Sequence, residues 1–323
     1  MNKNRNFFER HKKKILFVVV SSFFCLSLAT CEFLLRQFMG LGNPIIYNSS
    51  PIYGYRPLSN KEYARFWGKK ITFNNLGLRA DRDWNDEKHD KILFLGDSVT
   101  YGGTYIDNKE LFSHLAVQIL NETHNLHYLS GNAGVNAWGV ENIHGFIRES
   151  TFLPSSIYVT TLTEGDFYRG LTRIQGLPFF NKKPRFALQE LWYFFCYQQN
   201  NQRYKPWTTF LSEQDTIYVL EKAVKKLKEM DSFLKEKGYR HFLFISPYKS
   251  QVVEWESKDT SIYDLLVQYK LAPHYIIDEI AKYNLSKKER EGLFHDGTHL
   301  EKRGHELWAK IIATELKRQI PPQ

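Results

Sequence analysis

A buried strand that runs directly into a serine sets the limits on how this chain folds. Lys91–Leu95 (KILFL) is apolar after its first residue and is followed at once by Gly96-Asp97-Ser98. Polar turn residues come next, and apolar residues then recur at helical spacing through Leu111–Leu120. A run this apolar is typical of a strand that is covered on both faces, as in a parallel sheet. The segment therefore predicts a strand, a loop and a helix in that order.

The same alternation continues through the rest of the chain. With 323 residues, 42% of them apolar, the chain can bury a large core. We interpret residues 40–90, which are rich in turn-forming and charged residues, as a connector and entry segment with one short strand near Lys70–Phe73. Residues 91–320 then predict one α/β domain, a parallel sheet with helices on both faces. Further strands are expected at Leu126–Leu129, Ser156–Leu162 and His241–Ser246, and helices at Val140–Glu149 and Gln214–Gly238.

The N-terminus has the pattern of a membrane segment. Residues 1–14 hold six lysines and arginines against one glutamate, which is +5 of the formal net charge of +9. Ile15–Cys31 is an uninterrupted apolar or small-residue stretch, and the apolar character extends past Glu32 to Met39. We interpret residues 15–39 as an uncleaved transmembrane signal anchor. The positive-inside rule places residues 1–14 in the cytoplasm and the domain outside, in the periplasm or at the cell surface. Lipidation at Cys31 is a minor alternative.

Composition argues against several other partners. The charge that remains outside the N-terminus is unremarkable, and the body has no zinc-finger spacing or RNP-like motif, so we expect no nucleic acid. Cys25 and Cys31 fall in the apolar segment and Cys196 stands alone in the body, which excludes a disulfide within the domain. A lone cysteine without a Cys/His cluster also makes no convincing metal site. We expect neither a metal ion nor a cofactor.

Residues 176–210 interrupt the alternation with a dense aromatic cluster mixed with lysines and arginines. We interpret this stretch as an insertion packed over the sheet edge. A subsidiary core is the favoured interpretation, and a lid beside a substrate cleft is compatible with it. The aromatic residues are Phe179, Phe180, Phe186, Trp192, Tyr193, Phe194, Phe195, Tyr197, Tyr204 and Trp207.

Three residues carry the pattern of nucleophilic catalysis. Ligands of an open parallel sheet bind beyond the carboxyl ends of its strands, which is where Ser98 is expected. Near the C-terminus, Asp296-Gly297-Thr298-His299 precedes an amphipathic helix. An aspartate and a histidine three residues apart can share one loop, so that Asp296 orients the imidazole and His299 accepts the Ser98 proton. We predict a catalytic triad of Ser98, Asp296 and His299.

The motifs around these residues resemble those of the SGNH/GDSL hydrolase family. Ile92–Gly103 (ILFLGDSVTYGG) resembles the first signature block, and Asp296–His299 resembles the closing DxxH block. Asn74–Arg79 (NNLGLR) is similar to the N-x-x-G-x-R entry of bacterial membrane-anchored members, and Asn132–Gly139 falls where the second block should be. The resemblance covers roughly residues 74–316. It implies a three-layer α/β/α sandwich of the flavodoxin-like type.

The resemblance also implies an oxyanion hole with two departures from the family pattern. The family uses the serine N–H, the N–H of a second-block glycine and the side chain of a third-block asparagine. Ala137 aligns with the glycine and can still supply a backbone donor if its conformation permits. Gly165 replaces the asparagine, and the loss of one such donor typically costs about 10²–10³ in rate. Asn136 is the nearest amide in sequence, although an ordinary loop asparagine is the favoured interpretation. We expect Gly165→Asn to restore part of the lost stabilisation.

The leading functional hypothesis is a serine esterase that acts on ester-linked acyl groups through an acyl-serine intermediate. Because the predicted anchor places the site beside the cell envelope, the favoured substrates are O-acetyl groups of envelope carbohydrate. The alternatives are acyl transfer to a glycan, cleavage of a lipid ester, and a catalytically impaired glycan-binding or assembly subunit. Whether water or a sugar hydroxyl resolves the intermediate separates a hydrolase from a transferase.

Overall fold

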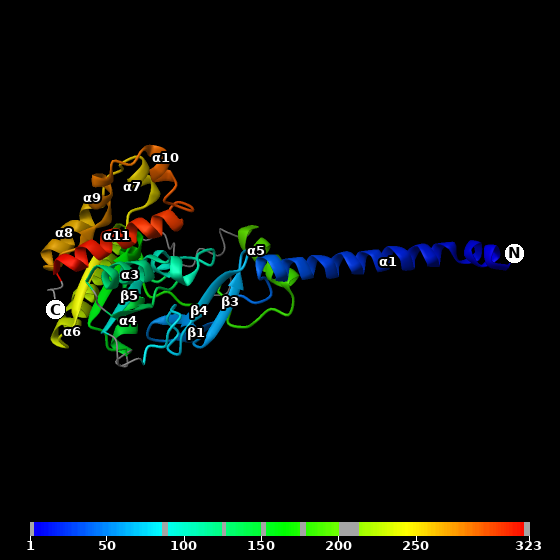
Figure 1. Ribbon diagram of the computed structural model, residues 1–323, viewed down its shortest axis with the longest axis horizontal. Helices are drawn as coiled ribbons and strands as arrows, with labels where there is room; N and C mark the ends of the chain where they lie inside the picture. Colours follow the sequence, from blue (N-terminus) through cyan, green and yellow to red (C-terminus); the bar gives the residue numbers. More distant parts are fainter. Residues whose placement is uncertain are drawn as a thin grey trace.

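A five-stranded parallel sheet forms the centre of the protein, and one long helix projects from the side of the domain (Figure 1). The computed structural model describes residues 3–85, 90–124, 127–149, 153–174, 179–199 and 213–319. The projecting helix is α1 (Lys3–Met39). The strands of the sheet are β5 (Asp90–Gly96), β6 (Tyr128–Asn132), β7 (Ile157–Leu162), β8 (Arg240–Ile245) and β9 (His274–Tyr275).

The strand order is β6-β5-β7-β8-β9, and all four pairings are parallel. The chain passes from β5 outward to β6 and then crosses back over β5 to β7, so the direction of winding reverses beside β5. This is the flavodoxin-like order, in which ligands bind at the switch point beyond the ends of these strands. The expected fold class is confirmed. Strand β9 was not predicted from the sequence, because two residues carry no detectable period.

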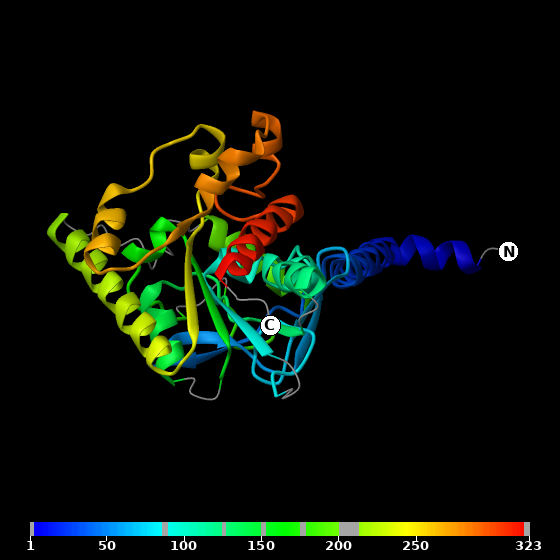
Figure 2. The ribbon, with the colours of Figure 1, turned by 60° about the vertical axis from the view of Figure 1, so that its left-hand side comes forward.

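Successive residues of β5 face opposite sides of the sheet, as the pleat requires. Leu93 and Leu95 join one buried apolar cluster, whereas Ile92 and Phe94 join another. Each cluster is closed by a pair of helices, so the domain has three layers (Figure 2). The first pair is α4 (Val140–Glu149) and α6 (Glu213–Glu236), and the second is α3 (Phe112–His124) and α11 (Lys302–Gln319).

The segment that we interpreted as a connector is folded into two antiparallel hairpins. Tyr47, Tyr55, Tyr63 and Phe73 from these hairpins are buried in the same cluster as Leu93. The sequence indicated only the short strand near Lys70–Phe73, which is β4. The other three strands were not predicted, because each is only four or five residues long and the charged residues between the aromatic ones resemble a loop. The strands are β1 (Tyr47–Ser50), β2 (Gly54–Pro57), β3 (Lys61–Arg65) and β4 (Lys69–Phe73).

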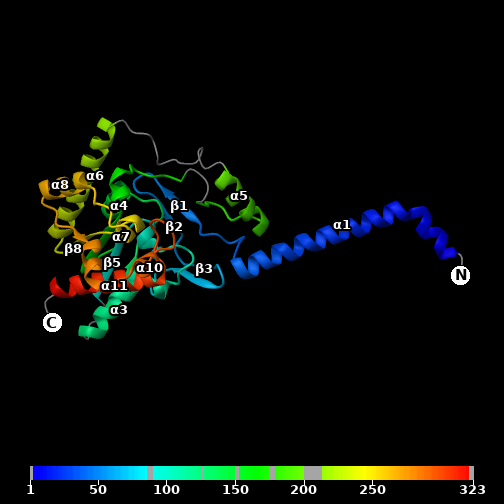
Figure 3. The ribbon, with the colours of Figure 1, turned by 90° about the horizontal axis from the view of Figure 1, so that it is seen from above.

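The aromatic insertion differs from the expectation in its packing. Its described helix, α5 (Ala187–Gln199), packs against the end of α1 rather than over the sheet edge (Figure 3). Residues 175–178 and 200–212, with Tyr204 and Trp207, lie outside the described residues, as does the start of the strand expected at Leu126–Leu129. The remaining elements are α2 (Ser98–Tyr101), η1 (Asn108–Glu110), η2 (Glu164–Tyr168), α7 (Lys249–Val253), α8 (Thr260–Gln268), α9 (Ile276–Ile280), η3 (Ala281–Tyr283) and α10 (Lys287–Glu291).

The long N-terminal helix is apolar and uncovered. Glu9–Met39, a stretch of 31 residues, is long and apolar enough to cross a membrane, and the most apolar part of it is not buried inside the protein. Such a helix is compatible with a signal anchor or with a signal peptide. Among the described residues it is the one helix with these properties.

A buried histidine links α11 to α3. The His305 ring is fully buried and stacks on Phe112, with ring centroids 5.7 Å apart. Its Nδ1 accepts a hydrogen bond from the Phe112 N–H at 3.2 Å, so the imidazole is held in its neutral form. Burial, together with the nearby Arg79 cation, lowers the pKa of His305 to about 3.

The stability of the domain should therefore fall in acid through His305. Between pH 6.5 and about 3 the unfolded chain binds a proton that the folded chain does not, so this residue should remove about 1.4 kcal/mol of unfolding free energy for each pH unit that the pH falls. Urea denaturation at pH 7 and pH 4 measures the difference. His305→Phe should be less stable at pH 7, because the Phe112 N–H loses its acceptor, but should lose less on acidification. Equal losses in both proteins would contradict the assignment.

Candidate active site

The end of β5 presents Ser98 at the switch point of the sheet. Ser98 is the first residue of α2, and the Asp97 side chain caps this helix by accepting a hydrogen bond from the Val99 N–H at 2.8 Å. The helix ends after one turn at Gly102, whose φ of 86° is left-handed. A Cβ on Gly102 would lie 2.2 Å from the Leu111 side chain, so glycine is required there. The short turn leaves Ser98 half-buried and accessible.

A second loop carries Asp296 and His299. One carboxylate oxygen of Asp296 accepts hydrogen bonds from the N–H groups of Thr298 and His299, both at 2.8 Å. An antiparallel bridge between Phe294 and Leu300 closes the loop. These local bonds fix the aspartate and the histidine side by side, as their spacing predicted.

The structure brings all three predicted triad residues together. His299 Nε2 lies 2.8 Å from Ser98 Oγ, and His299 Nδ1 lies 2.6 Å from Asp296 Oδ2. Burial acts to raise the pKa of Asp296, but the hydrogen bonds from His299 and Thr298 outweigh it and lower the pKa, so the carboxylate is ionised at neutral pH. The side chains of His299 and Asp296 are 35% and 50% exposed. This arrangement can deprotonate the Ser98 hydroxyl and stabilise the resulting imidazolium.

A second hydroxyl, imidazole and carboxylate set occurs inside the domain and shows why geometry alone is insufficient. Thr160 Oγ1 lies 2.9 Å from His241 Nε2, and His241 Nδ1 lies 3.0 Å from Asp231 Oδ1. The His241 and Asp231 side chains are 1% and 4% exposed, and Thr160 is fully buried. Although burial raises it, hydrogen bonds from His241 and Lys235 lower the pKa of Asp231 to about 2. This set joins β7, β8 and α6 and no substrate can reach it.

Arg79, the last residue of the N-x-x-G-x-R motif, holds the loop that follows Ser98. Its buried guanidinium donates to the carbonyl oxygens of Tyr101, Gly103 and Ile106, and its Nε donates to Asn108 Oδ1 at 3.0 Å. The guanidinium carbon also lies 5.0 Å from the centre of the Tyr101 ring. The entry motif is therefore a structural support for the nucleophile loop.

Arg169 connects three loops of the site, and the sequence did not indicate it. Its guanidinium lies 2.6 Å from an Asp166 oxygen and 3.7 Å from an Asp97 oxygen, and it donates to the Trp138 carbonyl at 3.2 Å. Burial and the neighbouring Asp97 carboxylate raise the pKa of Asp166, and Arg169 opposes the shift. The motif around Asp166 was recognisable, but no local pattern distinguishes Arg169 from a surface arginine.

Ala137 has the backbone conformation that a glycine would adopt there. Its φ is 60°, in the left-handed region that alanine rarely occupies. The Ala137 carbonyl accepts a hydrogen bond from the Thr172 hydroxyl at 2.9 Å, which holds the loop in place. The loop is tied to β5 by the Val135 N–H, which donates to the Gly96 carbonyl at 3.2 Å. An alanine therefore holds a backbone conformation that a glycine would adopt more readily.

The space beside Gly165 is filled by the side chain of Tyr248. The Gly165 N–H donates to the Tyr248 hydroxyl at 2.8 Å, and a Cβ on Gly165 would lie 2.4 Å from that oxygen. Tyr248 precedes α7, and the next residue, Lys249, donates its N–H to the Gly297 carbonyl in the His299 loop at 2.9 Å. This contact argues against the expectation that Gly165→Asn simply adds a donor, because the new Cβ would have to displace the Tyr248 hydroxyl. The Asn136 carbonyl accepts from the Tyr55 hydroxyl at 2.6 Å.

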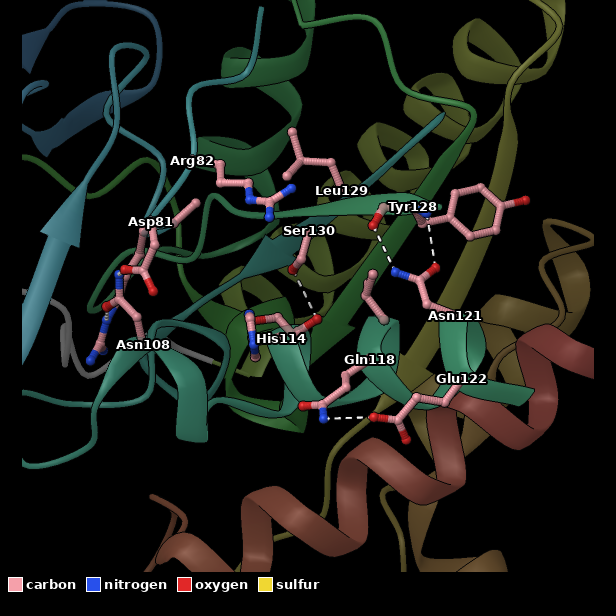
Figure 4. A pocket seen from close by; sticks show the side chains of 14 residues that line it. Asp81, Arg82, Asn108, His114, Gln118, Asn121, Glu122, Tyr128, Leu129 and Ser130 are labelled. Atoms are coloured by element: carbon pink, nitrogen blue, oxygen red, sulfur yellow. Dashed lines mark hydrogen bonds between the residues drawn. The ribbon is translucent and has the colours of Figure 1, made fainter. Parts of the chain in front are cut away.

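A cavity of about 360 Å³ lies at the edge of the sheet, between α3 and β6 (Figure 4). Asp81, Arg82, His114 and Gln118 are among the residues that line it, and none of the triad residues does. Arg79, which supports the nucleophile loop, also lines this cavity. We do not assign the triad's substrate to it.

Comparison with known proteins gives similar structures only. No protein-family model matches the chain, and no curated protein matches it. The structural neighbours are lipolytic hydrolases and esterases. A lipase/acylhydrolase from Enterococcus faecalis shares 13% identity at a TM-score of 0.45 and covers 72% of this chain and 98% of its own. A member of the lipolytic protein G-D-S-L family from Veillonella parvula shares 13% identity at a TM-score of 0.37, and the match covers 71% of this chain and 99% of the other. An acetyl xylan esterase shares 12% identity at a TM-score of 0.44, and the match covers 72% of this chain and 100% of the other. Identities and TM-scores this low do not assign a function.

The left-handed conformation at Ala137 makes a stability prediction. Ala137→Gly relieves the strain of a Cβ at positive φ, which outweighs the added flexibility of the unfolded chain, so the unfolding free energy should rise by about 0.5–1 kcal/mol. Ala133→Gly, in the same loop but not at positive φ, is the matched control and should destabilise the domain. Urea denaturation of the three proteins measures both changes. Destabilisation by Ala137→Gly would contradict the strain.

Proposed function

We propose that this protein is a serine esterase of the SGNH/GDSL type that cleaves ester-linked acyl groups through an acyl-serine intermediate. The observation that carries the proposal is the alignment of Ser98 Oγ, the His299 ring and the Asp296 carboxylate, with contacts of 2.8 and 2.6 Å. The buried set around His241 has similar distances but no access, whereas the Ser98 site is open to a substrate.

In the first half of the reaction Ser98 Oγ attacks the ester carbonyl while its proton moves to His299 Nε2. Asp296 holds Nδ1–H of the same ring and stabilises the imidazolium. The tetrahedral intermediate collapses with cleavage of the ester C–O bond. The leaving alkoxide takes the proton from His299 Nε2 and departs as the alcohol, and the acyl group remains on Ser98.

We propose three donors for the negative charge on the carbonyl oxygen. The Ser98 N–H is at a helix N-terminus, where it has no acceptor within the helix. The Ala137 N–H is the second donor. The Tyr248 hydroxyl is the third, because it occupies the space that a side chain at Gly165 would fill. A phenolic hydroxyl can accept from the Gly165 N–H and still donate its own proton.

In the second half a hydroxyl group attacks the acyl-serine carbonyl and gives its proton to His299 Nε2. The new tetrahedral intermediate releases the free acid when water attacks, or a new ester when a sugar hydroxyl attacks, and Ser98 Oγ recovers the proton. We propose water as the acceptor. Reaction of the same ester with and without an added sugar tests this, since a transferase would form acylated sugar.

The proposed substrates are O-acetyl groups of envelope carbohydrate. The support is positional: α1 has a long, uncovered apolar stretch, and six basic residues lie within residues 1–14, ahead of the most apolar part of the helix. We propose that α1 is a membrane anchor whose basic end stays in the cytoplasm, which would place the domain outside the cytoplasmic membrane. A protease added to spheroplasts should then digest the domain and leave an embedded N-terminal fragment.

The triad is tested on nitrophenyl acetate and on an acetylated glycan. Ser98→Ala and His299→Ala should each lower kcat by at least about 10³-fold, and Asp296→Asn by a comparable factor because it favours the wrong tautomer. Thr160→Val, which removes the buried hydroxyl bonded to His241, is the matched control and should keep its activity. A Ser98→Ala protein that retains a tenth of the activity would refute the assignment.

The third donor is tested at Tyr248 and Gly165. Tyr248→Phe should lower kcat by about 10²–10³-fold with little change in KM, as expected for a group that acts on the transition state. Gly165→Asn should also lower activity, since its Cβ displaces the Tyr248 hydroxyl. Gly170→Asn, where a Cβ meets nothing closer than 4.0 Å, is the matched control. Higher activity in Gly165→Asn would restore the missing-donor account.

A further inference from the structure

The end of α1 is bound to α5 by direct hydrogen bonds. The Glu32 carboxylate accepts from the Ala187 and Leu188 N–H groups at 2.8 and 2.9 Å, so it caps the first turn of α5. Arg36, one turn later on α1, pairs with Glu32 at 2.6 Å and donates to the Arg185 carbonyl at 3.0 Å. The position of α5 along the axis of α1 is therefore fixed.

That position corresponds to the surface of a bilayer. Between Lys14 and Glu32 the chain has 17 uncharged residues, which span about 26 Å at a rise of about 1.5 Å each. The hydrocarbon layer of a bilayer is about 30 Å thick. A charged pair such as Glu32 and Arg36 stays outside it. If α1 spans the membrane, the start of α5 lies in the headgroup layer.

Helix α5 places its charge inside and its aromatic rings outside. Glu190 is fully buried and pairs with Arg65 at 2.7 Å, and its carboxylate also accepts from the Gly42 N–H. In contrast, Trp192 and Phe195 are 60% and 49% exposed and stack on each other. This is the reverse of a helix on the surface of a soluble domain. Figures 1 and 3 show α5 lying across the line of α1 rather than continuing it.

The tip of the β3–β4 hairpin adds to the same region. The Trp67 side chain is exposed, and the residue as a whole is 80% exposed. The backbone N–H of Trp67 donates to the Phe38 carbonyl at 2.8 Å, at the end of α1. The Trp67 and Phe38 rings are 6.1 Å apart. Phe186 is exposed just before α5, next to the exposed cations Lys182, Lys183 and Arg185. Exposed aromatic rings together with basic residues are typical of segments at a membrane–water interface.

We propose that these exposed rings form a second membrane contact, in which α5 and the tip of the β3–β4 hairpin rest on the lipid headgroups around the exit of α1. We call this surface the aromatic collar, and it consists of Phe38, Trp67, Phe186, Trp192 and Phe195. The proposal rests on the proposed transmembrane role of α1. It adds that the catalytic domain is held against the bilayer in one orientation and does not swing on a flexible tether.

Contact with lipid is measured on the full chain in nanodiscs of phosphatidylcholine with brominated acyl chains, which quench adjacent tryptophans. The quenched part of the total emission should be smaller in Trp192→Phe and in Trp67→Phe than in the wild type. Trp255→Phe is the matched control, because Trp255 is 48% exposed but lies beside Arg290, away from α1. Its replacement should leave the quenched emission unchanged.

An unchanged quenched emission in Trp192→Phe overturns the collar. If Trp192 is then accessible to aqueous iodide, the face is in water, and if it is shielded from iodide, a second copy or another protein covers it. Alkaline carbonate extraction of the wild type separates this result from failure of the anchor. If the chain stays in the membrane and Trp192 is not quenched, only the proposal of the aromatic collar is contradicted. If the chain is extracted, the proposed membrane anchor is contradicted as well.

Discussion

Strand β5 is the element on which the rest of the structure depends. It is hydrogen-bonded to β6 on one side and to β7 on the other, and its alternate residues enter both apolar clusters. A strand buried on both faces and both edges has no freedom to shift its register, because a slip of one residue would exchange its two faces. The residue after its end is consequently fixed in space. That residue, Asp97, is followed by Ser98, so the rigid core fixes the position of the nucleophile.

Two arginines fix the conformation of the loops that follow the strands of the sheet. Arg79 binds the carbonyl groups of the loop after Ser98, and Arg169 joins Asp97, Asp166 and the Trp138 carbonyl. Each replaces several separate contacts by one planar group with five donors. Loops held in this way can present half-exposed side chains such as His299 without losing their geometry. The aromatic hairpins, which cover the sheet beside α4, complete the support.

The features of the fold and of the site that the sequence predicted depend on interactions between residues that are close together in the chain. The strands and helices follow from apolar periodicity, and the Asp296–His299 pair follows from a spacing that one loop can close with its own backbone bonds. Of the two hairpins between residues 47 and 73, only the strand near Lys70–Phe73 was predicted, because short strands with charged residues between aromatic ones have no clear period. Strand β9 was missed for the same reason. The packing of α5 was missed because it depends on contacts between residues far apart in the chain, such as the bond from the Ala187 N–H to Glu32 across 155 positions.

The sequence by itself determined which residues carry reactive groups and where the main strands of the sheet lie, since both depend on residue type and local spacing. Only the tertiary structure decided which of those groups meet. It placed His299 on Ser98 across 201 positions of sequence, filled the space beside Gly165 with Tyr248, and enclosed Thr160, His241 and Asp231 in the core. It also bound α5 to the end of α1 through Glu32. These contacts depend on how the layers pack, and packing is a property of the whole chain rather than of any segment.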